Sequence, residues 1–200
     1  MVAIDAAEKR LSEMVLKLYR LVDEALSGLE SPSLQRGASA RVDSIAKIAG
    51  EYRDSISSEA TLFIARFQPL GRDLIMAQSV ISVTYDLYRI ARYAREISIL
   101  ADALGGLEGN VDDEVLNAMK TARVMVGKSV KALIEKDRNS INEVYKDDDN
   151  IDKVYHKYLD ILASHPYIDR KSAASLLLAR HVERIADHAT YIAMAAEKLL

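Results

Sequence analysis

Apolar side chains recur at helical spacing along almost the whole chain. One stripe contains Met14, Leu18, Leu21, Val22 and Ala25. Residues three and four positions apart share one face of an α-helix, so each such stripe predicts an amphipathic helix. The whole chain predicts six helices, over residues 3–29, 40–67, 70–104, 111–136, 140–164 and 169–200.

Proline, glycine and helix-capping residues separate the predicted helices. Pro32, Pro69 and Pro166 each fall between two apolar stripes, and Pro32 lies in a stretch rich in glycine and serine. A glycine cluster at 105–109 has three predicted helices before it and three after it. Only the N-cap residue types within 137–140 divide the fourth helix from the fifth. Helices near 30 residues are about 45 Å long, which favours elongated antiparallel bundles.

Two segments that lie 95 residues apart are versions of one sequence. Residues 86–97 align with residues 181–192, and five of the twelve positions are identical, four of them small or apolar. Shared small and apolar positions indicate a common helical scaffold, so we infer an internal duplication. The sequence therefore predicts an all-α fold of two tandem three-helix bundles, with one domain at 1–107 and another at 108–200.

Composition narrows the class of protein. Half of the 200 residues are hydrophobic, which excludes a disordered chain, and 8 glycines with 3 prolines are too few for a β-sandwich. The net charge of −3 argues against a nucleic-acid binder. The absence of cysteine excludes disulfides, thiolate metal ligands and cysteine nucleophiles. No apolar run predicts membrane insertion or a signal peptide, so we expect a cytoplasmic protein.

Two acidic pairs with the same spacing form the candidate site. Glu183 and Asp187 are four residues apart, so they share a helix face, opposite the apolar side that contains Ile185. We therefore expect this pair to face outward. Asp148 and Asp152 repeat the spacing on the preceding helix, which is a neighbour in an up-and-down bundle.

Four carboxylates from two helices offer all-oxygen ligation to a hard or borderline cation. Like charges four residues apart cost an isolated helix about 0.2–0.5 kcal/mol, and a cation between them would remove that cost. The sequence therefore predicts a metal site, with iron, Mn, Mg and Zn as candidates. The alternative is that all four acids are solvated and that the chain is a metal-free interaction module.

The histidines give little support to catalysis. His181 and His188 flank the second acidic pair but lie off its face, so packing or surface roles are expected. Di-iron enzymes of helical bundles use Glu-x-x-His motifs, and none of the 4 histidines has glutamate three residues before it. No nucleophile–base arrangement is evident either, so we do not expect an enzyme.

Several segments resemble the PhoU family of phosphate-uptake regulators. Residues 65–74 resemble the family's connection between the second and third helices, and residues 86–90 and 181–189 resemble its third-helix signatures. Residues 148–152 resemble its acidic second-helix motif. The resemblance covers essentially the whole chain. It implies two three-helix bundles and a non-catalytic adaptor between the Pst phosphate transporter and a sensor histidine kinase.

The resemblance also implies metal ligands, because the family binds metal clusters through acids on the second and third helices of each repeat. In the second repeat these ligands would be Asp148, Asp152, Glu183 and Asp187. The equivalent positions of the first repeat are Ala46, Gly50, Tyr88 and Arg92. All four oxygen ligands are missing there, so no first metal site is expected.

This departure from the family pattern leaves other readings open. Arg92 places a cation where a metal would lie, and Arg89 and Arg95 are its neighbours on the third helix. This basic group is either a solvated or ion-paired helix flank, or a site for an acidic partner or phosphate. A chain with one metal site could also serve another transport or signalling partner. The sequence leaves open the metal, the partner and a homo-oligomeric state.

Overall fold

The computed structural model describes residues 2–30 and 38–200, and these residues form six α-helices. The helices are α1 (Val2–Leu29), α2 (Ala38–Phe67), α3 (Arg72–Leu104), α4 (Asp113–Glu135), α5 (Arg138–Ser164) and α6 (Arg170–Glu197). The all-α prediction is confirmed, and every predicted helix end lies within three residues of the observed one. Pro32, which was expected to mark the first connection, lies outside the described residues.

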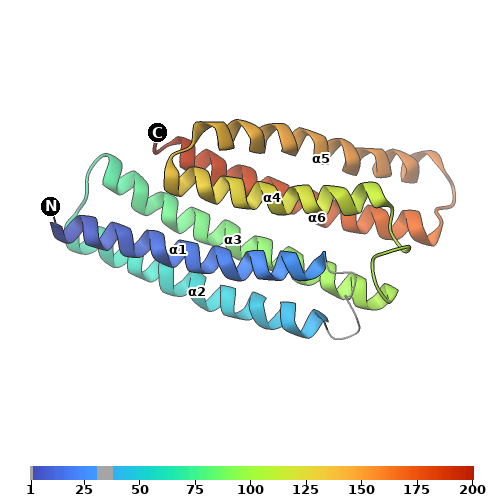
Figure 1. The fold of residues 1–200 in the computed structure, drawn as a ribbon, viewed down its shortest axis with the longest axis horizontal. Coiled ribbons are helices and arrows are strands. Elements are labelled where there is room, and N and C mark those ends of the chain that lie inside the picture. The colour runs from blue at the N-terminus through green and yellow to red at the C-terminus, as the bar shows by residue number, and fades with distance from the viewer. Residues whose placement is uncertain (1, 31–37) are drawn as a thin grey trace.

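The six helices are arranged as two antiparallel groups of three, α1–α3 and α4–α6, which lie side by side (Figure 1). Helices α3 and α6 pack against each other and join the two groups, and α1 also contacts α4. The predicted pair of three-helix bundles is therefore confirmed. One apolar core runs through both groups, so the division into domains 1–107 and 108–200 stays a prediction.

The inner helices α3 and α6 are buried on more than one side, unlike the outer helix α5. Each of them has 13 buried residues, whereas α5 has five. Fully buried alanines such as Ala91, Ala94, Ala186 and Ala189 let the two backbones approach closely, because an alanine side chain ends at Cβ. Within the parts of the chain that the structure describes, no helix has the length and hydropathy needed to cross a membrane.

The caps of the helices account for their ends. Gly105 ends α3 in the left-handed region at φ 79°, which glycine adopts without steric cost. Asp137 is the N-cap of α5, since its carboxylate accepts hydrogen bonds from the Asn139 backbone N–H at 3.0 Å and the Ser140 hydroxyl at 2.7 Å. The sequence signal for dividing α4 from α5 is therefore confirmed.

Polar side chains also connect the two helix groups. Arg123 of α4 donates hydrogen bonds to Asp23 of α1 at 2.7 Å and to Glu30 at 3.0 Å. His188 of α6 forms a hydrogen bond of 2.8 Å to Asp86 of α3, and both side chains are largely buried. The packing role expected for His188 is confirmed, because this residue joins the inner helices.

The position of α3 between the two groups can be tested with two isoleucines on the same helix. Ile90 is fully buried and Ile99 is 43% exposed. Ile90→Ala should lower the free energy of unfolding by about 2–5 kcal/mol, because it leaves a cavity in the core. Ile99→Ala should cost about 0.5 kcal/mol. Urea titration followed by circular dichroism measures both values, and equal losses would contradict this placement of α3.

Candidate functional site

The four acids predicted as metal ligands lie on α5 and α6, two helices that pack against each other. Burial is the largest cause that raises the pKa values of Asp148, Glu183 and Asp187, and the charge of Asp152, on α5, raises each of them further. The charge of Asp187 in turn raises the pKa values of Asp148 and Glu183. The two acidic pairs therefore lie within electrostatic range of each other across neighbouring helices, and we call these four residues the acidic cluster.

The cluster is more buried than the sequence suggested. Glu183 is only 9% exposed, so the expectation that this pair faces outward is wrong for Glu183. The physical reason is that α5 packs along α6, and the side chains of Arg180 and Arg184 also lie against this carboxylate. The side chain of Asp187 keeps 25% of its surface exposed. The cluster therefore has a buried part and a solvent-facing part.

Burial makes the ionised forms of these acids unfavourable. Loss of solvation, followed by the charge of Asp152, raises the pKa of Asp148 to about 6. Loss of solvation is also the largest cause that raises the pKa of Glu183 and of Asp187. One oxygen of Asp148, Oδ1, is buried and accepts no hydrogen bond from any described residue. The Thr190 hydroxyl near the Asp148 carboxylate lowers the pKa of this acid by a smaller amount, as a hydrogen-bond donor does.

Two arginines of α6 partly neutralise the cluster. Arg180 lies 2.9 Å from Glu183, and Arg184 lies 2.8 Å from Asp187 and 3.3 Å from Glu183. In residues 2–30 and 38–200, no three or more acidic or histidine side chains are arranged as the ligands of a metal ion. The arginines were missed in the sequence, although each precedes its acid by three residues, which is ion-pair spacing on a helix.

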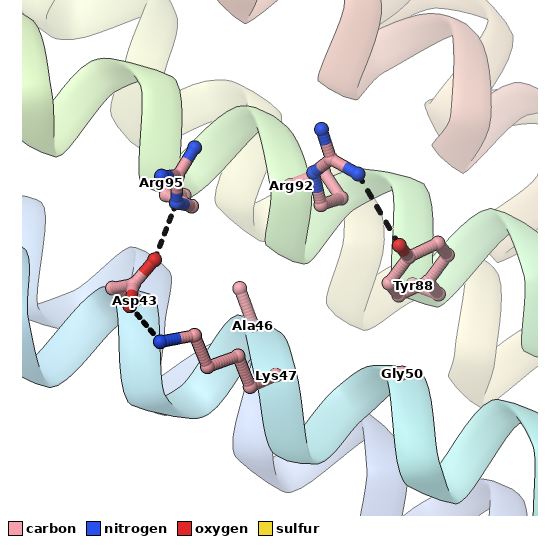
Figure 2. A pocket seen from close by; sticks show the side chains of 7 residues that line it. All are labelled: Asp43, Ala46, Lys47, Gly50, Tyr88, Arg92 and Arg95. Carbon is pink, nitrogen blue, oxygen red and sulfur yellow. Dashed lines mark hydrogen bonds and ion pairs between the residues drawn. The ribbon is translucent and has the colours of Figure 1, made fainter.

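The equivalent place in the first repeat is a cavity of about 330 Å³ between α2 and α3 (Figure 2). Its lining includes all four residues that the sequence placed at the missing ligand positions, Ala46, Gly50, Tyr88 and Arg92. The four residues therefore lie close together between α2 and α3, and their equivalence to the acids of the second repeat stays a prediction. Three further residues line the cavity. Arg95 was expected beside Arg92, whereas Asp43 and Lys47 were not expected.

Cationic side chains dominate this cavity. Asp43 on α2 accepts hydrogen bonds from Lys47, at 2.8 Å, and from Arg95 on α3. Arg92 donates a hydrogen bond of 3.3 Å to the Tyr88 hydroxyl, and no carboxylate of a described residue forms a salt bridge with it. The first repeat therefore presents cations at the place where the second repeat presents acids.

Comparison with known proteins gives one consistent result. Residues 115–196 match the family model described as the PhoU domain. The chain is 29% identical to a phosphate-specific transport system accessory protein PhoU homolog from Synechocystis, an alignment that covers 94% of this chain and 87% of the relative.

Two crystal structures have the same fold. The PhoU structure from Pseudomonas aeruginosa has a TM-score of 0.84 at 23% identity and covers 98% of this chain and 97% of its own. The phosphate transport system regulatory protein PhoU from Streptococcus pneumoniae has a TM-score of 0.83 at 20% identity, with 98% and 96% covered. The fold is therefore similar over nearly the full length of the chain.

The raised pKa of Asp148 predicts a pH-dependent effect in metal-free protein. Its value of about 6 exceeds the ordinary 3.8, so the folded state binds this proton more tightly than the unfolded state. The ionised carboxylate therefore destabilises the fold fully above about pH 6, and the cost disappears as the pH falls toward 3.8. Asp148→Asn should raise the free energy of unfolding at pH 7.5 by about 1–2 kcal/mol, allowing for solvent screening.

Urea titrations in the presence of a chelator measure this gain at several pH values. The increase in the free energy of unfolding caused by Asp148→Asn should shrink as the pH falls from 6 to about 4. Asp149→Asn, at an exposed neighbouring position on α5, is the control and should show little gain at any pH. A gain for Asp148→Asn that does not change with pH would contradict the placement of Asp148 in a crowded acidic cluster.

Proposed function

Because residues 115–196 match the PhoU domain and the chain is similar to PhoU homologs over nearly its full length, we propose that it is a PhoU-family protein that regulates phosphate transport as an accessory protein and not as an enzyme. The observation that carries this proposal is the similarity to a phosphate transport accessory protein over 94% of the chain. The matched family region, 115–196, also contains all four acids of the cluster between α5 and α6. Its partners would be components of the Pst phosphate transporter and a sensor histidine kinase. A cytoplasmic location stays a prediction.

The second repeat is proposed to bind a metal cation through Asp148, Asp152, Glu183 and Asp187. Four carboxylates accompanied by two arginines leave an excess of two negative charges, which a divalent cation would neutralise. Oδ1 of Asp148 is buried and accepts no hydrogen bond from the described residues, so this oxygen is available as a metal ligand. Carboxylate oxygens suit Mg²⁺, Mn²⁺ and iron and also bind Zn²⁺, so donor chemistry fits a cation without naming one.

A cation at this place would compete with two side chains for the same oxygens. Arg180 and Arg184 now hold Glu183 and Asp187, so metal binding would weaken or displace these ion pairs. Both arginines are partly exposed, with 41% and 34% of the side-chain surface accessible. Metal occupancy would in this way change the charge that α6 presents to a partner, which gives the proposed metal a regulatory role.

Mn²⁺ titration by calorimetry tests the metal proposal. Asp152→Asn combined with Asp187→Asn should weaken Mn²⁺ binding by at least about 10–100-fold, because even outer-shell changes at metal sites have effects of that size. Asp149→Asn, at an exposed position beside the cluster, should leave the affinity unchanged. Arg184→Gln should strengthen binding, since it removes a competing cation.

The competing reading is a metal-free interaction module. It is favoured by the ion pairs of Arg180 and Arg184, which already neutralise part of the acidic cluster. Under this reading Mn²⁺ and Fe²⁺ neither bind nor change the thermal midpoint, and Arg184→Gln destabilises the protein without a compensating gain in metal affinity.

The accessory role has its own test, which does not depend on metal. Immobilised protein should retain the ATPase subunit of a Pst-type phosphate transporter from an extract of the source organism. A strain that lacks the protein should lose normal repression of phosphate uptake when phosphate is plentiful. An unchanged phosphate response, together with no retention of any transport component, would refute the adaptor proposal.

A further inference from the structure

The cavity between α2 and α3 carries a net positive charge. Its lining has three cationic side chains, Lys47, Arg92 and Arg95, and one carboxylate, Asp43, so its formal charge is +2. Its volume of about 330 Å³ lies at the lower end of the range for small-ligand pockets, about 300–1,000 Å³. A cavity of this size and charge suits a small anion.

The cations are held in place before any ligand arrives. Figure 2 shows Arg95 of α3 and Lys47 of α2 both hydrogen-bonded to Asp43, whereas the Arg92 side chain of α3 extends towards the Tyr88 hydroxyl. Arg95 also donates a hydrogen bond of 3.0 Å to Glu96, which lies outside the lining. Arg92 has only the Tyr88 hydroxyl as a side-chain partner among the described residues, so its guanidinium keeps donors for a ligand.

The pKa of the Tyr88 hydroxyl reflects the positive charge of this region. The hydrogen bond from Arg92 and then the charges of Arg92, Arg53 and Arg89 lower the pKa of this phenol, although burial acts in the opposite direction. Arg53 also lies over the Tyr88 ring, 4.3 Å from its centroid. An environment that favours a phenolate favours other oxyanions for the same reason.

Small residues keep the cavity open. Gly50 and Ala46 stand where the second repeat has Asp152 and Asp148, so no side chain beyond a methyl group projects from these positions. A Cβ at residue 50 would lie 3.3 Å from Cε2 of Tyr88, closer than ordinary contacts. Glycine therefore lets Tyr88 lie against α2 with its hydroxyl in reach of Arg92.

We propose that this cavity binds a phosphoryl group through Lys47, Arg92 and Arg95, with the Tyr88 hydroxyl as a further partner. Guanidinium groups present several N–H donors in a planar fork that matches the oxygens of phosphate. The net charge of +2 matches a doubly charged tetrahedral oxyanion better than a monocarboxylate. The source of the group is either inorganic phosphate or a small molecule that carries phosphoryl groups. The inference is independent of the metal proposed for the second repeat.

Calorimetric titration of the full-length protein with inorganic phosphate, tripolyphosphate and ATP tests the proposal. A chelator removes metal from the acidic cluster, so the outcome does not depend on the metal proposal. Low salt limits the screening of charge between the cavity and the anion. Arg92→Gln should weaken binding about 10–100-fold, the usual effect of losing a charge-assisted hydrogen bond. Lys47→Glu, at an exposed position, should abolish it because it reverses a lining charge.

Arg20→Gln is the matched control, because Arg20 is an exposed arginine of α1 outside the lining. It should bind the anions as the unmodified protein does, and thermal midpoints should show that all three variants fold. Binding of inorganic phosphate that both cavity variants weaken supports a free-phosphate site. The same pattern with tripolyphosphate or ATP alone supports a larger phosphorylated ligand. No binding at about 1 mM of any probe, or binding that neither variant changes, overturns the proposal.

Discussion

The side-by-side packing of the second and third helices of each repeat is the constraint on which the rest of the structure depends. It brings four positions, two on each helix and four residues apart, to one place on the surface of the bundle. The buried alanines of α3 and α6 fix the inner helices, so this place is set by residues that take no part in its chemistry. The side chains at the four positions differ between the repeats, while the two helices pack against each other in both.

The side chains at these positions and beside them have opposite net charge in the two repeats. In the second repeat four carboxylates gather, and two arginines offset only part of their charge. In the first repeat the acids are replaced by Ala46, Gly50, Tyr88 and Arg92, and Lys47 and Arg95 add further positive charge. Two unit charges 4 Å apart interact by about 4 kcal/mol at an effective dielectric of 20, so these replacements reverse the preference for a cation. Loss of the acids alone would have left a neutral surface, and the added cations make an anion site.

Periodicity and capping were sufficient to predict the fold, because both depend on neighbours in the sequence. Asp137 and Gly105 act at the boundaries where their residue types predicted them. The counterpart positions of the first repeat were also predictable, since duplication preserves register. The burial of Glu183 was not, because it depends on how closely α5 covers α6. Asp43 and Lys47 were missed for a similar reason: their meeting with Arg95 depends on the distance between two helices and not on spacing within one.

One hydrogen bond between the inner helices α3 and α6 lies close in sequence to both candidate sites. His188 adjoins Asp187 in the sequence and is hydrogen-bonded to Asp86, which lies on α3 two residues from Tyr88. This contact is largely buried and helps to hold α6 against α3. Coupling between the sites would require each ligand to favour a different packing of α3 on α6, since a ligand shifts only an equilibrium that it binds unequally. The duplicated bundle thus brings two places of opposite charge to its surface, and the His188–Asp86 hydrogen bond between α6 and α3 lies close in sequence to both.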